Sequence, residues 1–126
     1  MRKSIVLLAL PTLLLLGANA TAEDAPVRAA ATKTVEVRDN FFSKAGSDSN
    51  LKSLRIKKDT IIKWVWGEDG QGTEVEHNVT CIKGNKCETE DFTMRAPYRK
   101  RITKTTVVVC TIHPTTMKTK FTVVNP

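Results

Sequence analysis

The stretch that decides the fold class is residues 54–66, LRIKKDTIIKWVW. In its second half, Ile62, Trp64 and Trp66 share one face of an extended chain, with Lys63 on the other. The first half alternates apolar and basic residues in the same way. Alternation with a period of two, carried by β-branched and aromatic residues, is typical of strands with one buried face. The stretch therefore predicts two consecutive β-strands.

The same period recurs along most of the chain, which predicts an all-β domain. It appears at 35–38, 77–81, 92–94, 107–110 and 121–123. Segments rich in Gly, Pro, Asn and Ser separate these runs at 45–50, 67–72, 83–85 and 96–97. No window shows a sustained helical period. Short strands with frequent turns favour a β-sandwich or a barrel, with Phe41, Phe42, Phe92 and Met94 expected to join the two tryptophans in its core.

The N-terminus has the three-part pattern of a secretory signal peptide. Arg2 and Lys3 precede an apolar run, and small residues follow it at 18–22. We expect cleavage after Ala22, with Ala20 as the alternative, so residues 1–22 form the signal. The apolar run is too short, and interrupted by a proline, for a membrane anchor. Residues 23–33 are expected to be a flexible mature N-terminus and 34–126 the folded domain.

The chain is basic, with a formal net charge of +7, and loss of the signal peptide leaves +5. Basic residues gather at 99–101 and at the pair Lys118 and Lys120. A surplus of positive charge favours partners with acidic surfaces. Nucleic acid is a poor candidate for a partner, because the protein is expected to be exported and its basic residues are not interleaved with an aromatic stacking surface.

Three cysteines, an odd number, are informative in an exported protein. Cys81 and Cys87 flank a turn-like stretch and are expected to pair as a disulfide across a hairpin. Cys110 is then left over. A free thiol in an oxidising compartment needs an occupant, and a metal ion is the simplest one.

The mature chain offers one complete donor set for that metal. Its two histidines are His77 and His113, and Met117 follows Cys110 in the same short segment, CTIHPTTM. Two imidazoles, one thiolate and a weak axial thioether form the ligand set of blue copper sites. Structural zinc sites normally have closely spaced ligand pairs on both sides, whereas here the upstream side offers only His77. A Cys–His nucleophilic pair is disfavoured because no third group orients it.

The chain resembles the cupredoxins, the small blue copper proteins that include plastocyanin, amicyanin and pseudoazurin. The resemblance covers the segment from about Val35 to Val124. It rests on the strand pair at 54–66, on EHNV at 76–79 and on CTIHP at 110–114, which is similar to the ligand loop of amicyanin-like members. Three residues separate His113 from Met117, an intermediate length between the amicyanin-like and plastocyanin-like loops.

The resemblance implies a single all-β domain with the Greek-key β-sandwich fold of the cupredoxins. It also implies further roles for residues at matching positions. Asn78 and Thr111 are expected to link the two ligand segments by hydrogen bonding and to tune the site. The backbone carbonyl of Glu76 is a possible weak axial ligand on the side opposite Met117.

The predicted function is that of an electron carrier, secreted across the inner membrane to the periplasm. One copper ion would cycle between Cu(I) and Cu(II), with redox proteins as donor and acceptor. The alternative is storage or delivery of copper, which is disfavoured because the chain lacks exposed Met/His-rich clusters. We expect a monomer, no stable membrane insertion and no catalytic activity, since no substrate pocket is readable.

Overall fold

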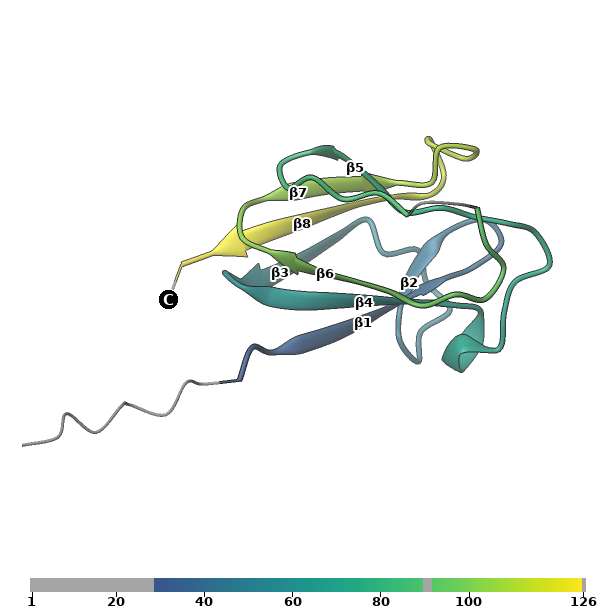
Figure 1. Ribbon diagram of the computed structural model, residues 1–126, viewed down its shortest axis with the longest axis horizontal. Coiled ribbons are helices and arrows are strands. Elements are labelled where there is room, and N and C mark those ends of the chain that lie inside the picture. The colour runs from purple at the N-terminus through teal and green to yellow at the C-terminus, as the bar shows by residue number, and fades with distance from the viewer. Residues whose placement is uncertain (1–28, 90–91, 126) are drawn as a thin grey trace, which may run out of the picture.

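The computed structural model describes residues 29–89 and 92–125, which form two four-stranded sheets packed face to face (Figure 1). The expected all-β sandwich is therefore confirmed. The predicted signal peptide and residues 23–28 lie outside the described part. The elements are β1 (Thr32–Val37), β2 (Phe42–Lys44), β3 (Ser53–Lys57), β4 (Thr60–Trp66), the 3₁₀ turn η1 (Glu68–Gly70), β5 (Thr80–Lys83), β6 (Tyr98–Ile102), β7 (Thr106–Val109) and β8 (Lys118–Val124).

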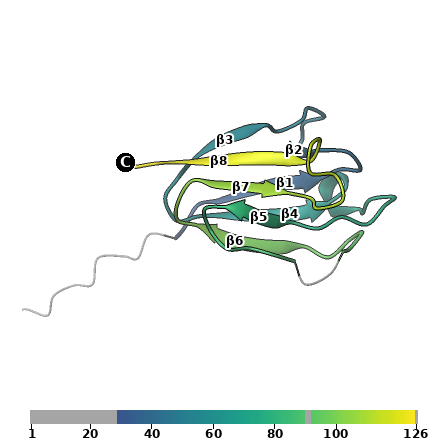
Figure 2. The ribbon, with the colours of Figure 1, turned by 90° about the horizontal axis from the view of Figure 1, so that it is seen from above.

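The first sheet has the strand order β2-β1-β4-β6 and the second has the order β3-β8-β7-β5. Each sheet contains one parallel pair, β1 with β4 and β3 with β8, among antiparallel neighbours. The chain passes from one sheet to the other at every connection from β2–β3 to β6–β7, and Figure 2 shows the strands of the two sheets lying one over the other. Strand β1 begins at Thr32, two residues before the expected start of the domain. Within the described residues, no helix is long and apolar enough to cross a bilayer.

Strand β4 carries the centre of the core, as its alternation predicts. Ile62, Trp64 and Trp66 are fully buried, whereas Lys63 on the other face is partly exposed. The ring of Trp64 lies edge-on to Phe121 of β8, with centroids 5.9 Å apart, and 5.5 Å from the ring of Tyr98. Contacts between large rings contribute both buried area and favourable edge geometry. Trp64 thus joins the two sheets.

The expectation that Phe92 and Met94 belong to a strand and to the core is wrong. Their exposed fractions are 43% and 46%, and residues 92–97 form no strand. Thr93 makes only an isolated bridge with His77. The apolar alternation there lies on a connection outside both sheets, where no opposite layer covers it. Conversely, the basic run at 99–101 lies within β6, at the edge of the first sheet.

The end of the sandwich away from the β7–β8 loop is closed by a disulfide and a polar cluster. Cys81 and Cys87 are bonded to each other, with Cα atoms 4.9 Å apart, as expected from their spacing. Beside them, the Asn85 side-chain oxygen accepts hydrogen bonds from the amides of Thr103 and Lys104, at 3.1 and 3.3 Å. Thr106 donates a third, at 3.0 Å. The β5 loop is thereby fastened to the β6–β7 turn.

Candidate metal centre

Three of the predicted ligands come together at one end of the sandwich. One ligand atom from each of His77, Cys110 and His113 lies within 4.8 Å of the other two. His77 and Cys110 are fully buried, and His113 is partly exposed. The Cys110 sulfur lies 3.7 Å from Nδ1 of His77. The unpaired thiol and both histidines of the chain therefore share one site.

Strand pairing explains how His77 reaches Cys110, which lies 33 residues later in the chain. Strand β5 is antiparallel to β7, with Thr80 opposite Val109. Continuing both chains past this pair brings the residues before β5 beside those after β7. His77 also pairs with Thr93 through backbone bonds of 2.9 and 3.0 Å. The upstream ligand is thus held from both sides.

The loop that carries Cys110, His113 and Met117 is closed by its own backbone. The amide of His113 donates to the Cys110 carbonyl at 3.1 Å, and the amide of Met117 donates to the His113 carbonyl at 2.8 Å. The Cys110 amide in turn donates to the Met117 carbonyl at 3.1 Å. These bonds set the backbone before any metal binds, which lowers the cost of ordering the ligands.

Met117 is fully buried, and it lies at the end of the ligand loop, immediately before β8. A residue outside the ligand loop also holds it in place, because the side chain of Asn50 donates a hydrogen bond to the carbonyl of Thr116 at 3.3 Å. One residue on, Leu51 accepts a 2.6 Å hydrogen bond from the hydroxyl of Thr119. The role of Met117 as an axial ligand stays a prediction. Glu76 is exposed, and a role for its carbonyl also stays a prediction.

Asn78 joins the two ligand segments directly. Its side-chain oxygen accepts a 2.8 Å hydrogen bond from the Thr111 amide, and its nitrogen donates to the Thr111 hydroxyl at 2.9 Å. A further bond of 3.3 Å reaches Thr80. The link expected between Asn78 and Thr111 is therefore present in the structure, whereas its effect on a bound metal stays a prediction.

Replacing Asn78 with alanine is expected to destabilise the metal-free protein by about 1–2 kcal/mol, because both bonds to Thr111 are lost. Urea unfolding monitored by circular dichroism measures this. The matched control is Thr111→Val, which removes only the hydroxyl and should cost less than about 1 kcal/mol. Equal stability of Asn78→Ala and the unmodified protein would show that the link carries no free energy.

The far side of the His77 ring faces a carboxylate that sequence reasoning missed. Nε2 of His77 lies 3.7 Å from Oδ1 of Asp39, and that oxygen accepts backbone hydrogen bonds from Glu74 at 3.0 Å and Val75 at 3.3 Å. Nε2 of His77 has no hydrogen-bond partner among the described residues, so Asp39 acts on the ring mainly through its charge. Asp39 follows β1, far from both ligand motifs in sequence, and no local pattern marks it.

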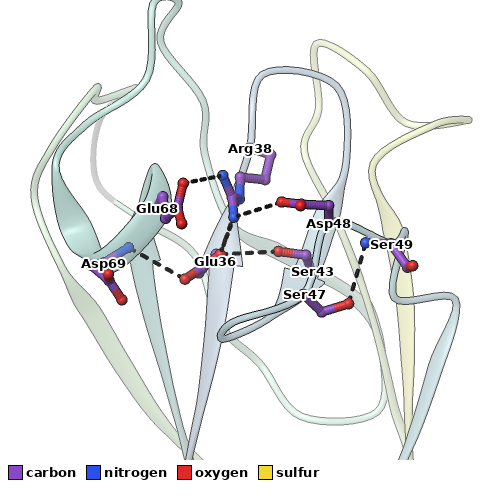
Figure 3. Close-up of polar contacts among 8 residues, drawn as sticks. All are labelled: Glu36, Arg38, Ser43, Ser47, Asp48, Ser49, Glu68 and Asp69. Carbon is purple, nitrogen blue, oxygen red and sulfur yellow. Dashed lines mark hydrogen bonds and ion pairs between the residues drawn. The ribbon is translucent and has the colours of Figure 1, made fainter.

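A buried ion pair holds the end of β1 that leads to Asp39 (Figure 3). The carboxylate of Glu36 is buried and lies 2.7 Å from the guanidinium of Arg38. Glu36 also accepts hydrogen bonds from the hydroxyl of Ser43 and the amide of Asp69, both at 3.3 Å. These contacts join β1, β2 and η1. A buried carboxylate with several donors is satisfied, so this cluster has a structural role.

The electrostatics of the site favour the neutral form of the His77 imidazole. Burial lowers the pKa of His77 below its ordinary value of 6.5, and the neighbouring His113 lowers it further, while Asp39 acts in the opposite direction. At neutral pH the ring therefore keeps a lone pair for a metal. Nδ1 of His113 is buried and has no hydrogen-bond partner among the described residues. Such an atom is costly unless something binds it.

The donor set therefore fits a copper ion. Neutral imidazole nitrogens and a thiolate sulfur suit both copper oxidation states, and a nearby buried thioether is a soft, weak ligand. His113 and Cys110 have no competing side-chain partner outside the site among the described residues. The arrangement offers a compact, preformed site for one soft metal.

Comparison with known proteins supports the fold. No protein-family model and no curated protein matches the chain. Among solved structures, the chain is similar to an amicyanin variant in its oxidised form, with 18% identity and a TM-score of 0.55 over 74% of this chain and 82% of that one. It is also similar to an amicyanin variant in the reduced state, with 20% identity and a TM-score of 0.51 over 76% and 83%.

Proposed function

We propose, from the cupredoxin-like fold of this chain, that it is an exported electron carrier with one type 1 copper site. His77, Cys110 and His113 would bind the ion, and Met117 would be its weak axial ligand. The observation that carries this proposal is the convergence of the only free cysteine of the described residues with both histidines in one site. When bound, copper supplies a centre that accepts and releases one electron.

For electron transfer, the protein would contribute a rigid arrangement of the ligand side chains. Fast electron transfer requires ligands that move little between the two oxidation states. Here Cys110 and Met117 are buried, and the Cys110 amide donates a hydrogen bond to the Met117 carbonyl. His77 is held by backbone hydrogen bonds to Thr93, and the next residue, Asn78, is bonded to Thr111 of the ligand loop. Close packing and satisfied hydrogen bonds restrict the positions that these side chains can adopt.

Partial exposure distinguishes His113 from the other proposed ligands. Its ring is the natural point at which electrons enter and leave, since a partner can approach it without opening the fold. Storage or delivery of copper would require donors that an acceptor can reach. The burial of His77, Cys110 and Met117 disfavours that alternative.

The remaining expectations belong to the same proposal. The protein would work in the periplasm as a monomer, without catalytic activity of its own and without stable insertion in a membrane. Its partners would be redox proteins that bind transiently through acidic surfaces, as its positive charge favours.

Absorption and EPR spectra of the mature protein, loaded with one equivalent of Cu(II), test the proposal. We expect an intense visible band and narrow copper hyperfine splitting, with reversible bleaching on reduction. Cyclic voltammetry should show one reversible one-electron wave. The balance of blue and green absorption would report on Met117. Bound copper without a coloured species would contradict the electron-carrier role and favour copper carriage or a different metal.

A further inference from the structure

The second sheet presents a face whose charged residues are all basic. The strands β3, β5, β7 and β8 contain no aspartate or glutamate. Their charged side chains, all exposed, are Arg55, Lys57, Lys83, Lys118 and Lys120. In sequence these residues lie in three separate segments, and only Lys118 and Lys120 stand out as a pair. We call the five residues the basic face.

Strand register places the five side chains on the same side of the sheet. In the β3–β8 pair, Lys120 lies opposite Ser53 and Arg55 lies opposite Thr122, so they point to one side. Val107 of β7 lies opposite both Lys120 of β8 and Lys83 of β5, so the side chain of Lys83 points to the same side as that of Lys120. The opposite side of the same strands buries Ile56, Val108 and Phe121 in the core. The basic face is therefore the outer surface of the sandwich.

The basic face has no neutralising partners in the described part of the chain. No carboxylate of these residues lies within 4.0 Å of a nitrogen of the five side chains, whereas Arg38 has three acidic partners. Charges that are exposed and unpaired interact freely with an approaching molecule and steer its association.

A groove connects this face to the proposed ligand loop. It has a volume of about 460 Å³ and is lined by Asn50, Lys52, Val107, Thr115, Thr116, Lys118 and Lys120. Thr115 and Thr116 lie between His113 and Met117 in the ligand loop. Lys52, immediately before β3, adds another positive charge. A partner on the basic face would therefore also contact the loop that carries His113.

We propose that the basic face, with Lys52 and this groove, is the docking surface for an acidic surface of a partner protein. The proposal rests on the proposed function, since docking here brings a redox partner against the ligand loop. The occupant must supply carboxylates in a shallow, extended array that matches the outer side of a sheet. Such interfaces form quickly and dissociate quickly, as electron transfer between proteins requires.

An anionic membrane is the less suitable occupant. Membrane-surface binding combines basic residues with apolar side chains that insert between lipids. Of the large apolar side chains exposed in the described part, only Ile82 lies on a strand of this sheet; Val75, Phe92, Met94 and Ile112 lie on loops. The basic face thus provides charge without an apolar wedge.

The matched comparison is the other group of basic residues, on the outer side of the first sheet. Lys63 of β4 lies opposite Arg99 of β6, and Arg101 lies two residues further on the same strand. This group has three positive charges. Strands β4 and β6 belong to the first sheet, whereas β7 and β8, which flank the ligand loop, belong to the second. Replacing three basic residues with glutamate in either group changes the net charge of the protein by the same amount.

The experiment uses the mature, ¹⁵N-labelled protein titrated with poly-L-glutamate at low salt. We expect chemical-shift changes in β3, β7, β8 and residues 115–116, and a dissociation constant that rises as salt is added. The variant Arg55→Glu/Lys118→Glu/Lys120→Glu should bind at least about tenfold more weakly, and Lys63→Glu/Arg99→Glu/Arg101→Glu less than about threefold more weakly. Co-sedimentation with phosphatidylglycerol vesicles provides the membrane comparison.

Equal weakening by both triple variants would overturn the proposal, because binding would then follow net charge alone. Shift changes on β4 and β6 instead of β3 and β8 would also overturn it. So would tight binding to the vesicles together with no binding to poly-L-glutamate. The absorption spectra of the copper-loaded variants distinguish the two proposals. A normal coloured site, together with poly-L-glutamate binding that is not confined to the basic face, would refute only the docking surface. Binding confined to the basic face, in a protein without a coloured site, would refute only the electron-carrier role.

Discussion

Replacing Cys110 with alanine is expected to abolish the intense visible band of the copper-loaded protein completely, while the sandwich remains folded. The band requires a thiolate bound to copper. Cys110 is the only free cysteine in the described residues, so no other thiol there can replace it. Copper affinity should fall by at least about two orders of magnitude, because the strongest of the proposed donors is lost.

The fold should survive this change because Cys110 follows the end of β7 and contributes a small side chain to the core. Removing one buried sulfur costs about 1 kcal/mol, far less than the stability of a typical domain. Absorption spectra, copper stoichiometry and circular dichroism measure the three effects. The control is Thr115→Ala in the same loop, where the side chain is exposed and the band should be unchanged. If Cys110→Ala kept its colour and copper, the ligand assignment would be wrong.

Replacing Trp64 with alanine should cause the largest loss of stability, about 3–5 kcal/mol. The side chain is fully buried and contacts the rings of Tyr98 and Phe121, so its removal opens a cavity between the two sheets. Urea unfolding of the metal-free protein, monitored by far-UV circular dichroism, measures this free energy without a contribution from copper.

A conservative variant keeps this test informative if the alanine variant does not fold. Trp64→Phe retains part of the ring and should cost about 1–3 kcal/mol. The control is Ile82→Ala, since Ile82 is 57% exposed and its truncation should cost less than about 0.5 kcal/mol. A loss for Trp64→Phe as small as that for Ile82→Ala would show that the two sheets are not joined through this residue.

Local sequence pattern was sufficient to predict the fold class and the part of the candidate site that lies on one loop. The period of two in β4 identifies its buried face because side chains alternate across a strand. The spacing in CTIHPTTM brings Cys110, His113 and Met117 into one loop, since residues so close in sequence cannot be far apart. The odd number of cysteines also indicated which thiol is free, and the disulfide between Cys81 and Cys87 agrees with that count.

The sequence pattern did not predict features that depend on which segments of the chain pack against each other. Phe92 and Met94 alternate like strand residues but have no sheet opposite them, so they are exposed. Asp39 reaches the ring of His77 only because β1 ends beside the 73–77 segment, through its bonds to the amides of Glu74 and Val75. Neither outcome has a signal within a few residues of the side chain concerned.

The sequence by itself determined that this is a β-sandwich with one spare thiol, two histidines and a net positive charge, because these follow from periodicity and composition. Only the tertiary structure decided that His77 meets Cys110, since their approach depends on the pairing of Thr80 with Val109. It also decided that basic residues from β3, β5 and β8 share one outer face. Strand register, a long-range property, selects the side of the sheet to which each side chain points.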